Sequence, residues 1–119
     1  AVPVGWRVRL REESIDLDLM PLLASLVDER NAARGAAAFH ATLVAALEDW
    51  IVQGARRCGI RTVALSGGCM ANRQLALVLP RRLAGRGLTV LTARAAPSND
   101  GGIALGQAWV AINRLLGQG

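Results

Sequence analysis

The order of predicted elements indicates an α/β fold with a largely parallel sheet. Large apolar and basic residues alternate over 6–11, and short β-branched runs occupy 62–65 and 89–91, which predicts three strands. Helical periodicity fills the intervals, giving the order strand, helix, helix, strand, helix, strand, helix. This alternation is typical of parallel strands joined by right-handed crossovers. We therefore expect one domain over residues 1–119.

The first half begins with the half-buried strand at 6–11 and a polar corner at 12–14. Ile15 and Leu17 then lead to Asp18, which we expect to cap a helix through Val27. Asn31 to Gly35 interrupt the helical pattern.

A longer helix is predicted from about Ala36 to Cys58, with Gly59 as its stop. Its apolar residues occur on most sides, so we expect it to be largely buried. His40 is then a hydrogen-bonded interior side chain, and Cys58 a small buried one.

The second half continues with the strand at 62–65, a glycine turn, and a helix from about 72 to 84. A strand at 89–91 follows, then a polar loop over 92–100 and a final helix from Ile103. No internal repeat or linker is visible.

Length and composition predict a compact cytoplasmic domain. The 119 residues are 52% hydrophobic, yet no uninterrupted apolar run reaches the roughly eighteen residues of a membrane span. There is no signal-peptide pattern, and the start at Ala1 without Met suggests an excised piece. The two cysteines, Cys58 and Cys69, have no metal-binding spacing and are expected to be reduced. A Cys69–His40 enzyme is disfavoured, because nothing in the sequence brings the two residues together.

Charge is divided unevenly between the halves. Residues 50–119 carry nine arginines and one acid, a formal charge of +8, whereas residues 1–49 carry five arginines and eight acids, a charge of −3. One Phe, three Trp and no Tyr leave little for stacking on bases, which argues against nucleic-acid binding. The arginines either steer small anions or lie solvated on helix faces.

The first candidate site is the turn Ser66-Gly67-Gly68, which is followed by Asn72 at a helix start. Unpaired N–H groups and the helix dipole favour a phosphate or carboxylate there, and glycines allow close approach to the main chain. The turn matches neither a P-loop nor a GxGxxG fingerprint. A glycine turn that merely joins strand to helix therefore stays an open alternative.

The second candidate site is the loop Asn99-Asp100-Gly101-Gly102 before the last helix. Asp100 is the isolated acid of the basic half, which suggests either a metal ligand or a helix cap made by Asn99 or Asp100. Both loops follow strands, so in a parallel sheet they could flank a single crevice.

These stretches resemble the carboxyl-terminal part of the HypF carbamoyltransferases of NiFe-hydrogenase maturation. The resemblance rests on residues 63–73 and 97–107, supported by 15–23 and 39–43. Family members show SGGVFQN and PPNDGG where this chain has SGGCMAN and APSNDGG. The departures are Cys69, Met70, Ala71 and Ser98, and they leave the glycines, Asn72 and Asp100 in place.

The resemblance implies an actin-like ATPase architecture (ASKHA, RNase H-like), of which this chain would be about half a module. The HypF-like enzyme cleaves carbamoyl phosphate, activates carbamate with ATP to carbamoyl adenylate, and passes the carbamoyl group to the carboxyl-terminal cysteine of HypE. The resemblance implies that Gly67 and Gly68 line the adenylate phosphate and that Ser66 and Asn72 also belong to the nucleotide-binding site. Asp100 would bind a divalent metal, Fe or Zn, together with an HxxxH pair that this chain, with His40 alone, lacks.

We expect such a fragment to be inactive alone and to self-associate through apolar surface. Two other functions stay open. One is a docking or scaffold domain that kept the fold and lost the chemistry. The other is a lobe of a TsaD-like enzyme that makes threonylcarbamoyl-adenosine in tRNA, although the pattern at 99–102 and at Phe39-His40 favours HypF.

Overall fold

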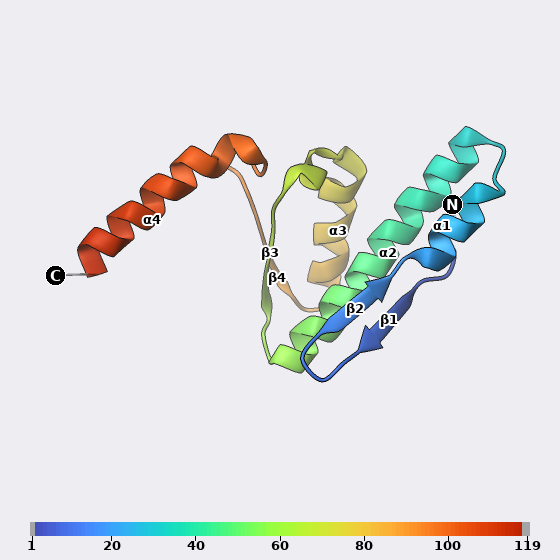
Figure 1. Cartoon of the computed structure of the whole chain (residues 1–119), viewed down its shortest axis with the longest axis horizontal. Coiled ribbons are helices and arrows are strands. Elements are labelled where there is room, and N and C mark those ends of the chain that lie inside the picture. The colour runs from blue at the N-terminus through green and yellow to red at the C-terminus, as the bar shows by residue number, and fades with distance from the viewer. Residues whose placement is uncertain (1, 118–119) are drawn as a thin grey trace.

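A computed structural model describes residues 2–117. It contains four strands, four α-helices and two short 3-10 turns (Figure 1). In chain order these are β1 (Arg7–Leu10), β2 (Ile15–Asp18), α1 (Met20–Val27), α2 (Ala32–Cys58), β3 (Thr62–Leu65), η1 (Gly68–Ala71), α3 (Arg73–Gly85), β4 (Thr89–Thr92), η2 (Asp100–Gly102) and α4 (Ile103–Gly117).

The strands form two separate pairs. β3 and β4 are parallel, with Val63 opposite Val90, which confirms the predicted pairing of the later strands. β1 does not join them, because it pairs antiparallel with β2, a strand that the sequence analysis took for the approach to a helix. Ion pairs Arg9–Asp18 and Arg11–Asp16 hold this hairpin. Asp18 still supports the following helix, since its carboxylate accepts from the Met20 N–H at 2.9 Å.

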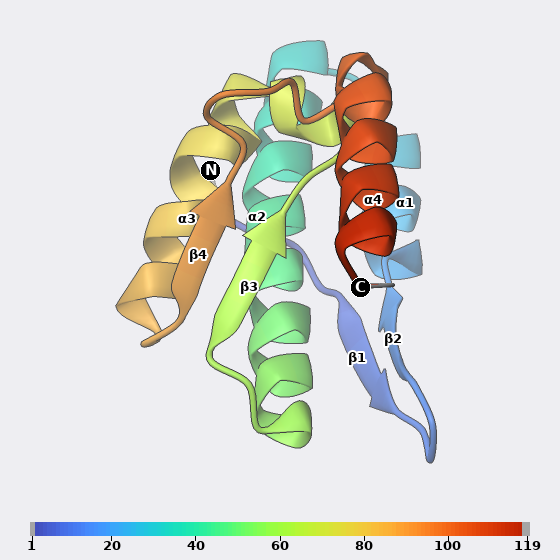
Figure 2. The same cartoon turned by 90° about the vertical axis from the view of Figure 1, so that its left-hand side faces the viewer.

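α2 is the central element of the fold. It runs between the β1–β2 hairpin and α3, and α2 and α3 together cover one side of the β3–β4 pair (Figure 2). It begins earlier than predicted, at Ala32, because the Asn31 side chain caps it by accepting from the Arg34 N–H at 3.0 Å. The core lies between α2 and α3 and consists of Val44, Val52, Leu75, Leu79 and Leu83.

By length and composition α2 could cross a membrane, but in this structure it packs against α3, α1 and the β1–β2 hairpin. Of its most apolar window 39% is buried, so the expectation of a largely buried helix is wrong, because its first and last turns extend beyond the core. The helix also holds Glu48, which is 7% exposed and forms ion pairs with Arg82 and Arg86 of α3. An ion-paired carboxylate and a shared apolar core are features of a core helix.

α4 stands away from the rest of the chain, so the expectation of a compact domain is wrong for this helix (Figure 1). The radius of gyration is 17.3 Å, against about 13.5 Å for a compact domain of this length. Every residue of α4 is exposed, including Trp109 at 68% and Leu116 at 74%. Among residues 2–117, the helix packs chiefly against η2.

The expectation of a buried Cys58 is also wrong. Cys58 is exposed because the last turn of α2 extends beyond the core formed with α3. Both cysteines are free thiols, as expected.

Candidate functional site

The two glycine loops meet at the carboxyl ends of neighbouring parallel strands (Figure 2). The Gly67 N–H donates to the Ser98 carbonyl at 2.7 Å, and the Ser66 hydroxyl donates to the same oxygen at 3.4 Å. The parallel register places both strand ends at one edge, as the sequence predicted. The loops thus form one continuous surface, which is exposed at Ser66, Gly67 and Gly68.

Gly67 and Gly68 serve the first loop in different ways. Gly67 has φ 106° and ψ 167°, a conformation that is essentially confined to glycine. Gly68 begins η1 with a negative φ, and a Cβ built there meets no atom within 4 Å. The fold therefore explains Gly67, whereas the space above Gly68 is free for a ligand.

Asn72 begins α3 and is fixed by hydrogen bonds. Its side-chain oxygen accepts from the Gln74 and Leu75 N–H groups at 3.0 and 3.2 Å, so it is the helix cap. Its Nδ2 lies 2.9 Å from Nε2 of His40 on α2. His40 is hydrogen-bonded as predicted, but it is half-buried at the edge of the site. The sequence alone does not predict this contact between α2 and α3.

In the second loop the cap is Asn99, whose side chain accepts from the Gly101 N–H at 3.0 Å. Gly102 is required sterically, because a Cβ there would lie 2.6 Å from the Pro97 carbonyl oxygen. Asp100 is exposed and forms no ion pair with any residue in the described range 2–117. Of the two capping candidates, the structure therefore uses Asn99 and leaves the Asp100 carboxylate free.

The metal predicted at Asp100 does not fit the described residues by themselves. Over positions 2–117 no three or more His, Cys, Asp or Glu side chains gather in a way that could hold an ion. One carboxylate is too few ligands for Fe or Zn. Asp100 as a metal ligand stays a prediction, because the other ligands would have to come from outside this part of the chain.

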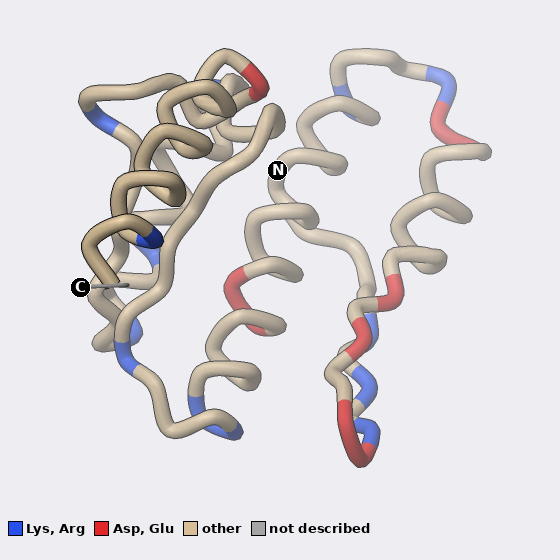
Figure 3. Tube along the Cα trace, turned by 60° about the vertical axis from the view of Figure 1, so that its left-hand side comes forward, with Lys and Arg blue, Asp and Glu red and all other residues tan. Residues whose placement is uncertain are grey.

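The charges around the site favour an anion. Most acids lie on the β1–β2 hairpin, in the loop between α1 and α2, and in the second half of α2 (Figure 3). Asp100 is the one acid of residues 50–117, and the arginines of that half are spread over α2, α3, α4 and the loops. The positive potential of these arginines adds to the positive dipole ends of the helix starts.

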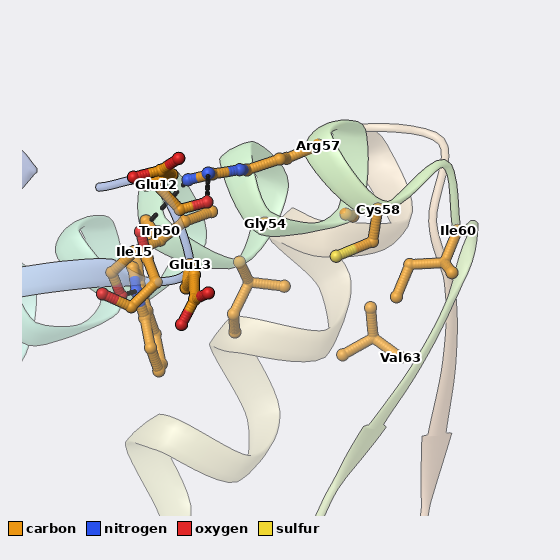
Figure 4. Close-up of a pocket in the computed structure, with 12 residues that line it drawn as sticks. Glu12, Glu13, Ile15, Trp50, Gly54, Arg57, Cys58, Ile60 and Val63 are labelled. Carbon is orange, nitrogen blue, oxygen red and sulfur yellow. Dashed lines mark hydrogen bonds between the residues drawn. The ribbon is translucent and has the colours of Figure 1, made fainter. Parts of the chain in front are cut away.

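An apolar cleft of about 560 Å³ lies elsewhere, between the hairpin turn, the end of α2 and the start of β3 (Figure 4). Ile15, Trp50, Cys58 and Val63 line it. The Trp50 indole N–H donates to the Ile15 carbonyl at its rim, at 2.7 Å. The cleft adjoins the start of β3, whereas the glycine loop follows the carboxyl end of the same strand. The cleft is therefore separate from the predicted site.

Comparison with known proteins agrees with this architecture. Residues 3–107 match the family model described as carbamoyltransferase, Kae1-like domain, second subdomain. The chain is 60% identical to carbamoyltransferase HypF2 of Cupriavidus necator over 96% of its own length and 14% of that protein. It is 52% identical to carbamoyltransferase HypF of Rhizobium leguminosarum over 76% of its length and 12% of that protein.

Solved structures show the same likeness. A crystal structure of full-length HypF in the phosphate- and nucleotide-bound form superposes with a TM-score of 0.81 at 31% identity, covering 93% of this chain and 15% of the other. HypF of T. kodakarensis gives a TM-score of 0.69 at 26% identity, over 85% of this chain and 14% of the other. The α/β architecture is thus that of a HypF module, and the chain belongs to the HypF carbamoyltransferase family, in which it corresponds to the second subdomain of the Kae1-like domain.

Proposed function

We propose that this chain is the nucleotide-binding lobe of a HypF-like carbamoyltransferase. The observation that carries the proposal is the hydrogen bond between the Gly67 N–H and the Ser98 carbonyl, which joins the two glycine loops at one edge of a parallel pair. Such an edge, with helix starts facing it, binds phosphates in other α/β proteins. The likeness to a HypF structure that holds phosphate and nucleotide supports this assignment.

In the proposed reaction, which takes place in the cytoplasm, the thiolate of the carboxyl-terminal cysteine of a HypE-like partner attacks the carbamoyl carbon of carbamoyl adenylate. A C–S bond forms, the bond between the carbamoyl carbon and the phosphate oxygen breaks, and AMP leaves. Ser66, Gly67 and Gly68 bind the adenylate phosphate, and Asn72 contacts the nucleotide. N–H groups of the same turn stabilise negative charge that develops on the carbamoyl oxygen during attack by the thiolate. The chain spans 14% of its Cupriavidus relative, so the formation of carbamoyl adenylate from carbamoyl phosphate and ATP belongs to other parts of a complete protein.

A complete site also needs a second wall. The loop residues are exposed, and a two-stranded parallel pair with Leu91 55% exposed on its outer face is unusual, because parallel sheets are normally covered on both faces. We propose that another lobe of the parent protein covers this face and the apolar side of α4. That lobe would also provide any further ligands of a metal at Asp100.

The test is isothermal titration of the complete protein with ATP, before and after the joint change Asn72→Ala and Gly68→Val. We expect the double variant to lose at least about tenfold in affinity, since it removes a polar contact and fills the space of a phosphate. Gly85→Val is the matched control, because Gly85 also has no atom within 4 Å of a Cβ but lies at the far end of α3. An unchanged affinity in the double variant would leave the scaffold function as the better description.

A further inference from the structure

The Asn72 side chain has one hydrogen-bond donor without a partner among the described residues, on its amide nitrogen. Its oxygen has two lone pairs, and the N–H groups of Gln74 and Leu75 use them. Its amide nitrogen has two hydrogens, and one of them lies toward His40 Nε2 at 2.9 Å. One Nδ2–H is left, on a side chain that is exposed to solvent.

The hydrogen bonds of His40 determine which ring nitrogen carries the proton. Nδ1 lies 2.8 Å from the Ala36 carbonyl oxygen, which can only accept, so Nδ1 must be protonated. Nε2 of the neutral ring then has a lone pair and accepts from Asn72. The ring is further held by an edge-to-face contact with Phe39, with centroids 5.4 Å apart and planes at 84°.

This arrangement allows one orientation of the Asn72 amide. A flipped amide would turn its NH₂ group toward the Gln74 and Leu75 N–H groups and its oxygen toward the Nε2 lone pair. Every one of these contacts would be repulsive, because it would bring donor to donor or acceptor to acceptor. His40, on α2, therefore adds to the two backbone groups of α3 in fixing how Asn72 faces the glycine loop.

We propose that His40 is a positioning residue that holds Asn72 as a hydrogen-bond donor, through its one free Nδ2–H, toward a phosphate oxygen of the bound nucleotide. The inference rests on the proposed function, since it takes Asn72 as a nucleotide contact. It specifies the chemistry of that contact, because a fixed amide of this kind can meet only an acceptor on the ligand. Without His40 the amide loses one of its three partners and part of its orientation.

A structural role alone would predict a different pattern of effects. If His40 merely ties α2 to the start of α3, its loss lowers stability and leaves nucleotide affinity unchanged. Asn31→Ala is the matched control for that case, because Asn31 caps α2 with a similar bond, 3.0 Å to the Arg34 N–H, and makes no contact with the glycine loops. His40→Gln keeps an acceptor near the position of Nε2, whereas His40→Asn is too short to place one there.

The experiment uses the complete protein and measures the dissociation constant for ATP by calorimetry and the melting temperature without nucleotide. We expect His40→Ala and His40→Asn to weaken ATP binding about tenfold, the size of one charge-assisted hydrogen bond, and His40→Gln to stay within about twofold of the parent protein. Asn31→Ala should lower the melting temperature and leave the affinity unchanged.

An affinity unchanged in His40→Ala, or a His40→Gln variant as weak as His40→Asn, overturns the inference. If His40→Ala fails to fold, the comparison of His40→Gln with His40→Asn tests the positioning role by itself. Asn72→Ala measured in parallel separates the nucleotide site from the positioning role of His40. If it weakens ATP binding while the His40 variants do not, the site stands and the positioning role fails. If the parent protein has no ATP site beyond the one in the part that forms carbamoyl adenylate, the proposed function itself fails.

Discussion

Two adjacent glycines offer a test that separates ligand binding from folding. Gly67 adopts φ 106° and ψ 167°, a conformation that costs a residue with a side chain about 1–3 kcal/mol. Gly68 has a negative φ and nothing within 4 Å of a built Cβ. We therefore expect Gly67→Ala to destabilise the chain by about 1–3 kcal/mol, and Gly68→Ala to change its stability by no more than about 0.5 kcal/mol.

The two variants should differ in nucleotide affinity in a way that their stabilities do not predict. A methyl group on Gly68 occupies the space in which a phosphate would approach the main chain, so loss of one charge-assisted contact weakens ATP binding about tenfold or more. Urea unfolding of the chain gives the stabilities, and calorimetry on the complete protein gives the affinities. Gly85→Ala is the control for an equally open glycine outside the site. A Gly68→Ala protein that binds ATP as tightly as the parent would refute the reasoning.

Two further predictions concern packing. Glu48 is 7% exposed and pairs with Arg82 and Arg86, which are about half exposed, so Glu48→Gln should lower the free energy of unfolding by about 2 kcal/mol, a discounted sum of two charge-assisted bonds. A loss under about 0.5 kcal/mol in urea unfolding would mean that solvent screens the network. The isolated chain should self-associate through α4, and Trp109→Glu should reduce the association. Light scattering that shows a clean monomer at high concentration for the unaltered chain would contradict this.

The elements with strong periodicity could be predicted from the sequence. β3, α3 and β4 were placed to within a few residues because their apolar positions repeat with one clear period and glycine or asparagine marks their ends. β2 could not be predicted, because four residues that alternate Ile, Asp, Leu, Asp fit a strand and an approach to a helix equally well. Only the pairing with β1 decides between the two.

The sequence predicts the two main-chain loops that make up the site, but it does not predict the side-chain contacts between them and the neighbouring helices. Turns can be recognised from a few neighbouring residues, so the sequence predicts both glycine loops. The parallel order of β3 and β4 then predicts that the loops meet at one edge of the sheet. The bond between His40 and Asn72 joins residues that are 32 positions apart, and periodicity carries no information on such pairs. The burial of Cys58 was predicted from its helix, but exposure there depends on where the partner helix ends.

The most direct test of the central claim is a crystal structure of the complete protein with a non-hydrolysable ATP analogue. We expect phosphate density within hydrogen-bond distance of the Gly68 N–H group and of the Asn72 side-chain nitrogen, over the turn that the Gly67 N–H closes by its bond to the Ser98 carbonyl. Nucleotide bound at another place in the protein, with solvent alone over these two loops, would contradict it.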